Sequence, residues 1–187
     1  MSSTGPAQAI WPIGPVCSGC YDAVLHHPRE CPACGNQAAL IGRIDDETVC
    51  GPCAGSDRTY ACRDCGVPCR AVADGLCARC YAQGKFDRIL ANASDEWSPL
   101  RRVPQETDSP LALVVWLRRS RGAGLLADLV ASGQPPSHAD LPAGKAEHYL
   151  RSLLVEVDIL DPRSEPLERL PEWVDALVAD DPVDFQQ

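Results

Sequence analysis

The stretch that decides the fold is CPACGNQAALIGRIDDETVCGPC (residues 31–53), followed after eight residues by CRDCGVPCRAVADGLCARC (residues 62–80). All 11 cysteines of the 187-residue chain lie between Cys17 and Cys80. Ten of them form Cys-x-x-Cys pairs, and Cys69 is left over. The pairs are Cys17/Cys20, Cys31/Cys34, Cys50/Cys53, Cys62/Cys65 and Cys77/Cys80.

The spacing within these pairs predicts metal sites. A gap of two residues lets both thiolates of a pair face one ion, and Zn²⁺ takes four such ligands in a tetrahedron. The N-terminus shows no secretory signal pattern, so we expect a cytoplasmic protein. In that reducing compartment paired cysteines are more often metal ligands than disulfides. We therefore predict two or three structural Zn²⁺ ions.

The context of the pairs suggests how they combine. In CPACG and CRDCG, the glycine after the second cysteine permits the tight turn of a zinc knuckle. The pairs at Cys50 and Cys77 instead begin segments that can start a helix. A knuckle followed by a helix-opening pair is the layout of a zinc ribbon or a treble clef. We expect one site from residues 31–53 and a second from residues 62–80.

The first pair leaves alternatives open. A third ion can take Cys17, Cys20 and either His26 or His27, with an additional donor. Alternatively, the first pair shares an ion with the next pair along the chain and shifts every later pairing, or the sites are cross-braced. Spacing alone does not decide among these arrangements, and the eleventh cysteine is expected to be a spare, inert thiol.

The ligand supply favours structural ions over catalytic ones. A catalytic zinc site usually keeps three protein ligands and an open position, often with histidine and a carboxylate base. Here the donors are almost all cysteine, and the His-x-Glu signature of zinc deaminases is absent. The sequence also lacks a Gly-rich phosphate loop and a Ser-centred elbow. We expect a protein without enzymatic activity.

Apolar composition divides the chain into two unlike parts. Residues 17–80 contain nine Leu, Ile and Val and no Phe, Trp or Met, too few for a core without cross-links. Residues 81–187 contain 32 Leu, Ile, Val, Phe and Trp, an ordinary globular proportion. We predict a small zinc-stapled module, with knuckles like those of zinc ribbons and treble clefs, followed by an all-α domain. The expected boundaries are a flexible N-terminus (1–15), a multi-CxxC zinc-binding module (16–90), a linker (91–108), an acidic helical domain (109–180) and a tail (181–187).

Start and stop signals predict the helices of the second part. Asp108-Ser109-Pro110 predicts a helix with Ser109 as N-cap and Pro110 in the first helical position. A second apolar stripe ends at Gly133, and the clearest apolar face belongs to a helix over about residues 145–160. A last amphipathic helix is expected over Leu170–Val178.

Charge and hydropathy exclude two classes of protein. With 17 basic and 26 acidic side chains the net charge is −9, which excludes nucleic-acid binding that depends on a broad positive field. Most of the acidic excess lies in residues 91–187, which carry 9 basic and 17 acidic groups. The longest apolar run, Leu111–Leu117, is far shorter than the roughly 20 residues of a membrane span, so we expect no membrane association.

The order of several motifs resembles a known family. The elements are CPACG at Cys31, VCGPCAG at Val49, ACRDCG at Ala61, GLCARC at Gly75, WLR at Trp116 and HYLRSLLVEVDIL at His148. Together they resemble the N-terminal region of actinobacterial tyrosine recombinases of the Xer-type integrase kind, over roughly residues 11–179. In that family the Arg, Lys and nucleophilic Tyr of catalysis lie beyond this region, and this chain has no such set. The resemblance implies a front module without recombinase activity that is associated with DNA.

We therefore predict a non-catalytic zinc-binding recognition module, associated with DNA recombination or mobile elements, that binds DNA, a protein partner or both. The alternative is a protein–protein adaptor without a nucleic-acid role. Basic side chains near the expected ions, and a cluster on a predicted helix, are the candidates for phosphate contact. They are Arg58, Arg63, Arg70, Arg79, Lys85, Arg88, Arg118, Arg119 and Arg121.

Overall fold

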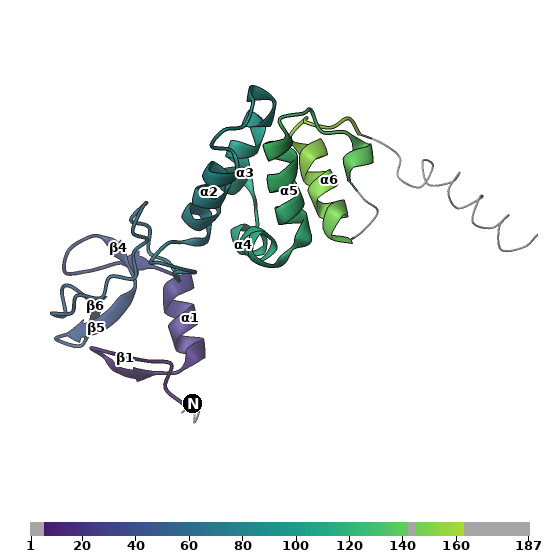
Figure 1. Ribbon diagram of the computed structural model, residues 1–187. Helices are drawn as coiled ribbons and strands as arrows, with labels where there is room; N and C mark the ends of the chain where they lie inside the picture. Colours follow the sequence, from purple (N-terminus) through teal and green to yellow (C-terminus); the bar gives the residue numbers. More distant parts are fainter. Residues whose placement is uncertain (1–5, 142–144, 163–187) are drawn as a thin grey trace, which may run out of the picture.

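The computed structural model describes residues 6–141 and 145–162. Small antiparallel hairpins and one helix form the N-terminal part, and the chain then continues into an all-α region (Figure 1). This order of small hairpins and then helices agrees with the predicted fold class. The predicted helix Leu170–Val178 and the predicted tail lie outside the described residues.

The strands of the described residues form three two-stranded antiparallel hairpins. The β5–β6 hairpin turns at Asp45 and Asp46, whose φ values of 46° and 66° suit a tight two-residue turn that follows the twist of the strands. Its second strand ends on Cys50, so the hairpin carries a predicted ligand at its end. The hairpins are β1 (Ala9–Trp11) with β2 (Gly14–Val16), β3 (Arg29–Glu30) with β4 (Gln37–Ala38), and β5 (Leu40–Ile44) with β6 (Glu47–Cys50).

Trp11 is the centre of a small core in the N-terminal part. Its side chain is 4% exposed and packs in a cluster with Leu25 of helix α1 (Ser18–His26) and Ile41 of β5. Its indole N–H donates to the hydroxyl of Tyr60 over 2.8 Å. The β1–β2 hairpin therefore differs from the predicted flexible N-terminus. The reason is that a tryptophan side chain buries a large apolar area, about 150–250 Å² for an aromatic residue.

The helices of the all-α region agree with most of the predicted boundaries. Pro110 opens α4 after Ser109, and Gly133 ends α5 in the left-handed conformation with φ 67°. α6 ends at Glu156, before the predicted Leu160, and Asp158 beyond it has a φ of 60°. The elements are α2 (Ala78–Ile89), the 3-10 helix η1 (Asp95–Arg102), α3 (Val103–Glu106), α4 (Pro110–Arg119), α5 (Arg121–Ser132), the 3-10 helix η2 (His138–Asp140) and α6 (Lys145–Glu156).

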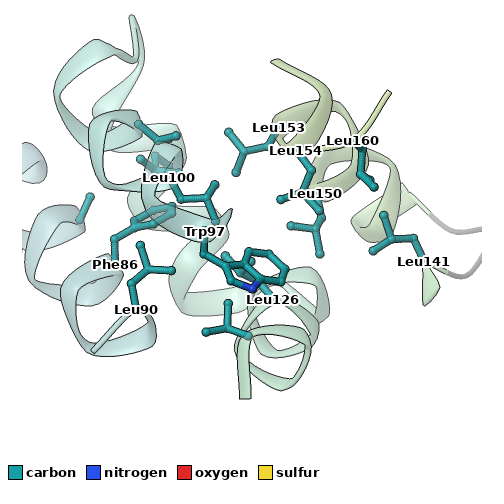
Figure 2. Packing of buried hydrophobic residues seen from close by; sticks show 14 of the residues in the cluster. Phe86, Leu90, Trp97, Leu100, Leu126, Leu141, Leu150, Leu153, Leu154 and Leu160 are labelled. Carbon is teal, nitrogen blue, oxygen red and sulfur yellow. The ribbon is translucent and has the colours of Figure 1, made fainter. Parts of the chain in front are cut away.

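One apolar cluster holds this region together (Figure 2). Phe86 of α2, Trp97 of η1, Leu126 of α5 and Leu154 of α6 are all completely buried in it. α2 therefore belongs to the helical core, although its first turn lies inside the cysteine-rich sequence. The change from hairpins to helices falls near Cys77, earlier than the predicted boundary at residue 90.

Residues 91–108 are also part of the helical core, where we predicted a linker. η1 and α3 occupy most of this segment, and Trp97, Leu100 and Pro104 are buried. The guanidinium of Arg101 donates to the backbone oxygen of Leu90 over 2.7 Å, which closes the turn between α2 and η1. A 3-10 helix has three residues per turn, so it shows no α-helical apolar stripe in the sequence.

Candidate metal centres

The structure brings eight of the predicted ligands into two clusters. In each cluster the four sulfur atoms all lie within 4.8 Å of one another. The pairing is the one predicted from the local contexts, with neither a shift nor a cross-brace. Site 1 consists of Cys31, Cys34, Cys50 and Cys53, and site 2 consists of Cys62, Cys65, Cys77 and Cys80.

Site 1 joins the β3–β4 hairpin to the end of β6. Its knuckle turns at Gly35, which has a φ of 72° and donates its N–H to the Cys31 carbonyl over 2.8 Å. The backbone N–H of Cys50 donates to the Cys31 sulfur over 3.3 Å. The predicted helix start at Cys50 is absent, because the chain folds back there: a Cβ on Gly51 would stand 2.0 Å from the carbonyl oxygen of Arg58.

Site 2 repeats the knuckle and adds a helix. Gly66 has the same φ of 72°, and the backbone N–H of Cys77 donates to the Cys62 sulfur over 3.2 Å. Cys77 is the N-cap of α2, and its sulfur accepts the backbone N–H of Cys80 over 3.4 Å. The second pair of site 2 therefore opens a helix, as its sequence predicts.

The spacing of the sulfur atoms fits a tetrahedral ion. Cys34 and Cys50 place their sulfur atoms 3.8 Å apart, and Cys65 and Cys77 place theirs 3.9 Å apart. A tetrahedron with Zn–S bonds of about 2.3 Å has sulfurs about 3.8 Å apart, whereas a disulfide needs about 2.05 Å. Four thiolates also close the coordination shell of a Zn²⁺ ion. Both sites thus have the donor set and the size of structural zinc sites.

The thiols of each site differ in acidity. Burial opposes ionisation of Cys31, but backbone N–H groups, led by that of Cys50, outweigh it and lower the pKa to about 6. Burial likewise opposes ionisation of Cys62, and backbone N–H groups led by that of Cys65 lower its pKa to about 6. The hydrogen bond with Cys50 is the main cause that raises the pKa of Cys53 to about 12. Full ionisation of four such close thiols requires a cation among them.

The first cysteine pair joins neither cluster. Cys17 is the N-cap of α1, and Cys20 is an exposed residue in its first turn. A hydrogen bond with Cys17 is the main cause that raises the pKa of the Cys20 thiol. His26 and His27 lie at the opposite end of the same helix. The predicted third site made by this pair and a histidine is therefore not assembled in the described residues.

Cys69 also lies outside both clusters, although it follows the knuckle of site 2 closely. Burial is the main cause that raises its pKa to about 11, and the nearby thiols of Cys77, Cys62 and Cys65 raise it further. A thiol with this pKa is protonated at neutral pH, which makes it a poor nucleophile.

Five of the candidate phosphate ligands already have partners within the chain. Arg63 pairs with Asp64 over 3.7 Å, and Arg70 pairs with Asp22 over 2.7 Å. Three others donate to backbone carbonyls: Arg58 to Ile10, Arg79 to Pro104 and Arg88 to Gly84. Arg79 has the most constrained position of these, because it also donates to the carbonyl of Gln105.

The remaining candidates lie on α2, on α4 and at the start of α5. Lys85 and Arg118 both stand over the ring of Tyr81, at 5.6 Å and 5.8 Å from its centroid. These distances are those of cation–π contacts. Arg119 is exposed on α4, and Arg121 is exposed at the first position of α5.

A groove of about 980 Å³ runs between α4, the end of α1 and residues 68–72. Arg70, Arg118 and Arg119 all line it. Two large apolar side chains of α4, Leu111 and Val115 from the apolar run of the sequence, line it as well and are 58% and 48% exposed. Their exposure depends on where α4 packs, and the helical apolar pattern gave no sign of it. We call this feature the α4 groove.

Comparison with protein-family models, curated proteins and solved structures finds no match for this chain. The family resemblance therefore rests on the motifs alone. What the geometry defines is a metal-binding module with two four-cysteine sites, followed by a helical region. Within residues 6–141 and 145–162, no helix combines the length and the apolar character that crossing a membrane requires.

Proposed function

We propose that this chain is a non-catalytic recognition module that binds DNA in a recombination or mobile-element setting. Two Zn²⁺ ions stabilise the N-terminal part, and arginine side chains contact phosphates. The motif order shared with the front region of tyrosine recombinases supports the setting. The four-sulfur sites support a structural role of the metal, because they leave no ligand position for a substrate.

The observation that carries the DNA proposal is the convergence of Arg70, Arg118 and Arg119 on the α4 groove. Arg70 is distant in the sequence from the neighbouring residues Arg118 and Arg119, and the fold brings all three to one surface. Lys85 extends this surface, because it shares the ring of Tyr81 with Arg118. Such a local cluster offers phosphate contacts even though the whole chain has a net charge of −9.

A salt series tests this proposal. Three phosphate contacts correspond to a slope of about −2.7 in log K against log salt, so affinity for duplex DNA falls about 40-fold between 50 and 200 mM. The double variant Arg118→Gln/Arg119→Gln weakens binding and flattens the slope. The matched control, Arg29→Gln/Arg43→Gln, removes two exposed arginines that do not line the groove and leaves the slope unchanged. Absence of binding at 50 mM salt contradicts the proposal.

The second candidate function is a protein–protein adaptor without a nucleic-acid role. The exposure of Leu111 and Val115 in the same groove favours it, since apolar side chains gain nothing from phosphate. The same salt series separates the two functions. An adaptor shows no shift with duplex DNA at any salt concentration.

A further inference from the structure

Helix α4 presents apolar side chains to solvent next to α6. Leu111 and Val115 are 58% and 48% exposed, and Tyr149 of α6 is 41% exposed. The ring centroids of Trp116 and Tyr149 lie 5.2 Å apart, so the two helices share one surface. A groove of about 710 Å³ follows α4 there, and Leu111, Val115, Trp116 and Arg119 line it. We call the surface of Leu111, Val115, Trp116 and Tyr149 the α4–α6 face. Apolar surface of this kind marks a contact site in soluble proteins.

The described part of the chain ends close to this face. Pro162 lines a small groove together with His148, the residue that precedes Tyr149 in α6. Residues 163–169 span up to about 24 Å when they are extended. The whole of α6 is only about 18 Å long. The chain that follows Pro162 is therefore long enough to place Leu170 on the α4–α6 face.

The composition of residues 163–187 complements this face. Their apolar side chains repeat at helical spacing and form one stripe, which consists of Leu170, Trp173, Val174, Leu177 and Val178. The same segment carries seven acidic and two basic side chains. Residues 110–121, which form α4 and the start of α5, carry three arginines and no acidic side chain. Both the apolar pattern and the charge of the two segments therefore match.

The charged residues also follow the apolar ones in the same order in both segments. In α4, Arg119 comes three residues after Trp116 and is exposed. In the C-terminal segment, Asp180 and Asp181 come two and three residues after Val178. A helix that lies parallel to α4 therefore brings these two carboxylates to the guanidinium of Arg119 while its apolar stripe covers the apolar side of α4.

We propose that the C-terminal segment of this chain docks on the α4–α6 face of the same chain, as a helix over Leu170–Val178 that runs parallel to α4. Its apolar stripe covers Leu111, Val115 and Tyr149, and its aspartates pair with Arg119. Leu111, Val115 and Arg119 also line the α4 groove. The docked segment therefore covers one edge of the α4 groove as well.

Hydrogen exchange of the full zinc-loaded chain tests the docking. A helix of nine residues is marginal in water by itself, so slow exchange in residues 170–178 reports packing. Relative to intrinsic rates, we expect these amides to exchange about 10-fold more slowly in the wild type than in the variant Trp173→Ala/Leu177→Ala.

A substitution on the opposite side of the contact gives a second reading. Val115→Gln, which makes the α4–α6 face polar, is expected to cause the same loss of protection in residues 170–178. The matched control is Ile44→Gln, at a side chain of β5 that is 42% exposed, and it keeps the protection. The amide of Leu154 stays protected in every variant, which shows that the helical core is folded.

Three results overturn the docking. The first is fast exchange of residues 170–178 in the wild type. The second is protection that Val115→Gln leaves unchanged, because the segment then packs elsewhere. The third is protection that falls on dilution, because a contact with a second copy depends on concentration and a contact within one chain does not. None of these readouts depends on DNA binding, so they decide the docking separately from the proposed function.

Discussion

The backbone N–H of Cys77 donates a hydrogen bond to the sulfur of Cys62 over 3.2 Å, and the equivalent contact in site 1 measures 3.3 Å. The knuckle glycines Gly35 and Gly66 also match, with the same φ of 72°. The two sites are thus one local structure built twice in succession. They differ after the last ligand pair, where site 2 continues into α2 and site 1 turns back.

Removal of metal is expected to unfold the N-terminal part and spare the helical core. Residues 17–80 contain nine Leu, Ile and Val, so the ions supply most of their stabilisation. Hydrogen exchange with and without a chelator measures this. The amide of Cys50 loses its protection, while that of Leu154 keeps it, and added Zn²⁺ restores the first. Unchanged protection of Cys50 in metal-free protein contradicts the prediction.

Loss of one ligand is expected to empty one site only. Cys53→Ser removes a sulfur of site 1, and the hydroxyl is a much weaker zinc ligand, so the chain binds one ion fewer. Cys69→Ser is the control, because Cys69 lies in neither cluster and its loss leaves the ion count unchanged. Metal analysis of both purified variants measures the difference. An equal loss in both variants contradicts the ligand assignment.

Trp97 is expected to be the largest single contribution to the helical core. Its side chain is completely buried, so Trp97→Ala costs about 3–5 kcal/mol of unfolding free energy. Its indole nitrogen is buried and has no hydrogen-bond partner in the described residues, so Trp97→Phe costs clearly less. Leu111→Ala, at a side chain that is 58% exposed, stays within about 0.5 kcal/mol. Urea unfolding followed by circular dichroism ranks the three variants, and equal costs contradict the prediction.

Alanine substitutions at Gly124, inside α5, and at Gly133, its C-cap, are expected to change stability in opposite directions. Gly133 ends the helix at φ 67°, where a Cβ is strained, so Gly133→Ala lowers stability by about 1 kcal/mol. Gly124 lies inside the helix with open space beside it, so Gly124→Ala raises stability by about 1 kcal/mol. Thermal unfolding of both variants measures the signs, and equal signs contradict the assignment of the helix end.

The metal sites were predictable because their chemistry is local. A Cys-x-x-Cys-Gly knuckle is fixed by five consecutive residues, so the pairing of sites 1 and 2 followed from context. Cys17 and Cys20 lack this context, and the spacing left their role open. The helix boundaries at Pro110 and Gly133 were equally local, since proline and glycine act through their own backbone angles.

The core segments that were missed depend on contacts between distant residues. Trp97 lies among polar residues in the sequence, and only packing against other helices buries it. Trp11 precedes the cysteines, and its burial needs Leu25, Ile41 and Tyr60. No periodic pattern marks either residue, so the sequence predicts a linker around Trp97 and a flexible end around Trp11.

Helix α2 begins with two ligands of site 2 and ends in the apolar core around Phe86. Arg79, between those ligands, is bonded to the carbonyls of Pro104 and Gln105. The first turn of α2 therefore depends on the metal of site 2, whereas its last turns are held by the apolar core. If site 2 loses its ion, we expect the first turn of α2 to lose the support of the knuckle, while Arg79 and the core around Phe86 still hold the helix in place.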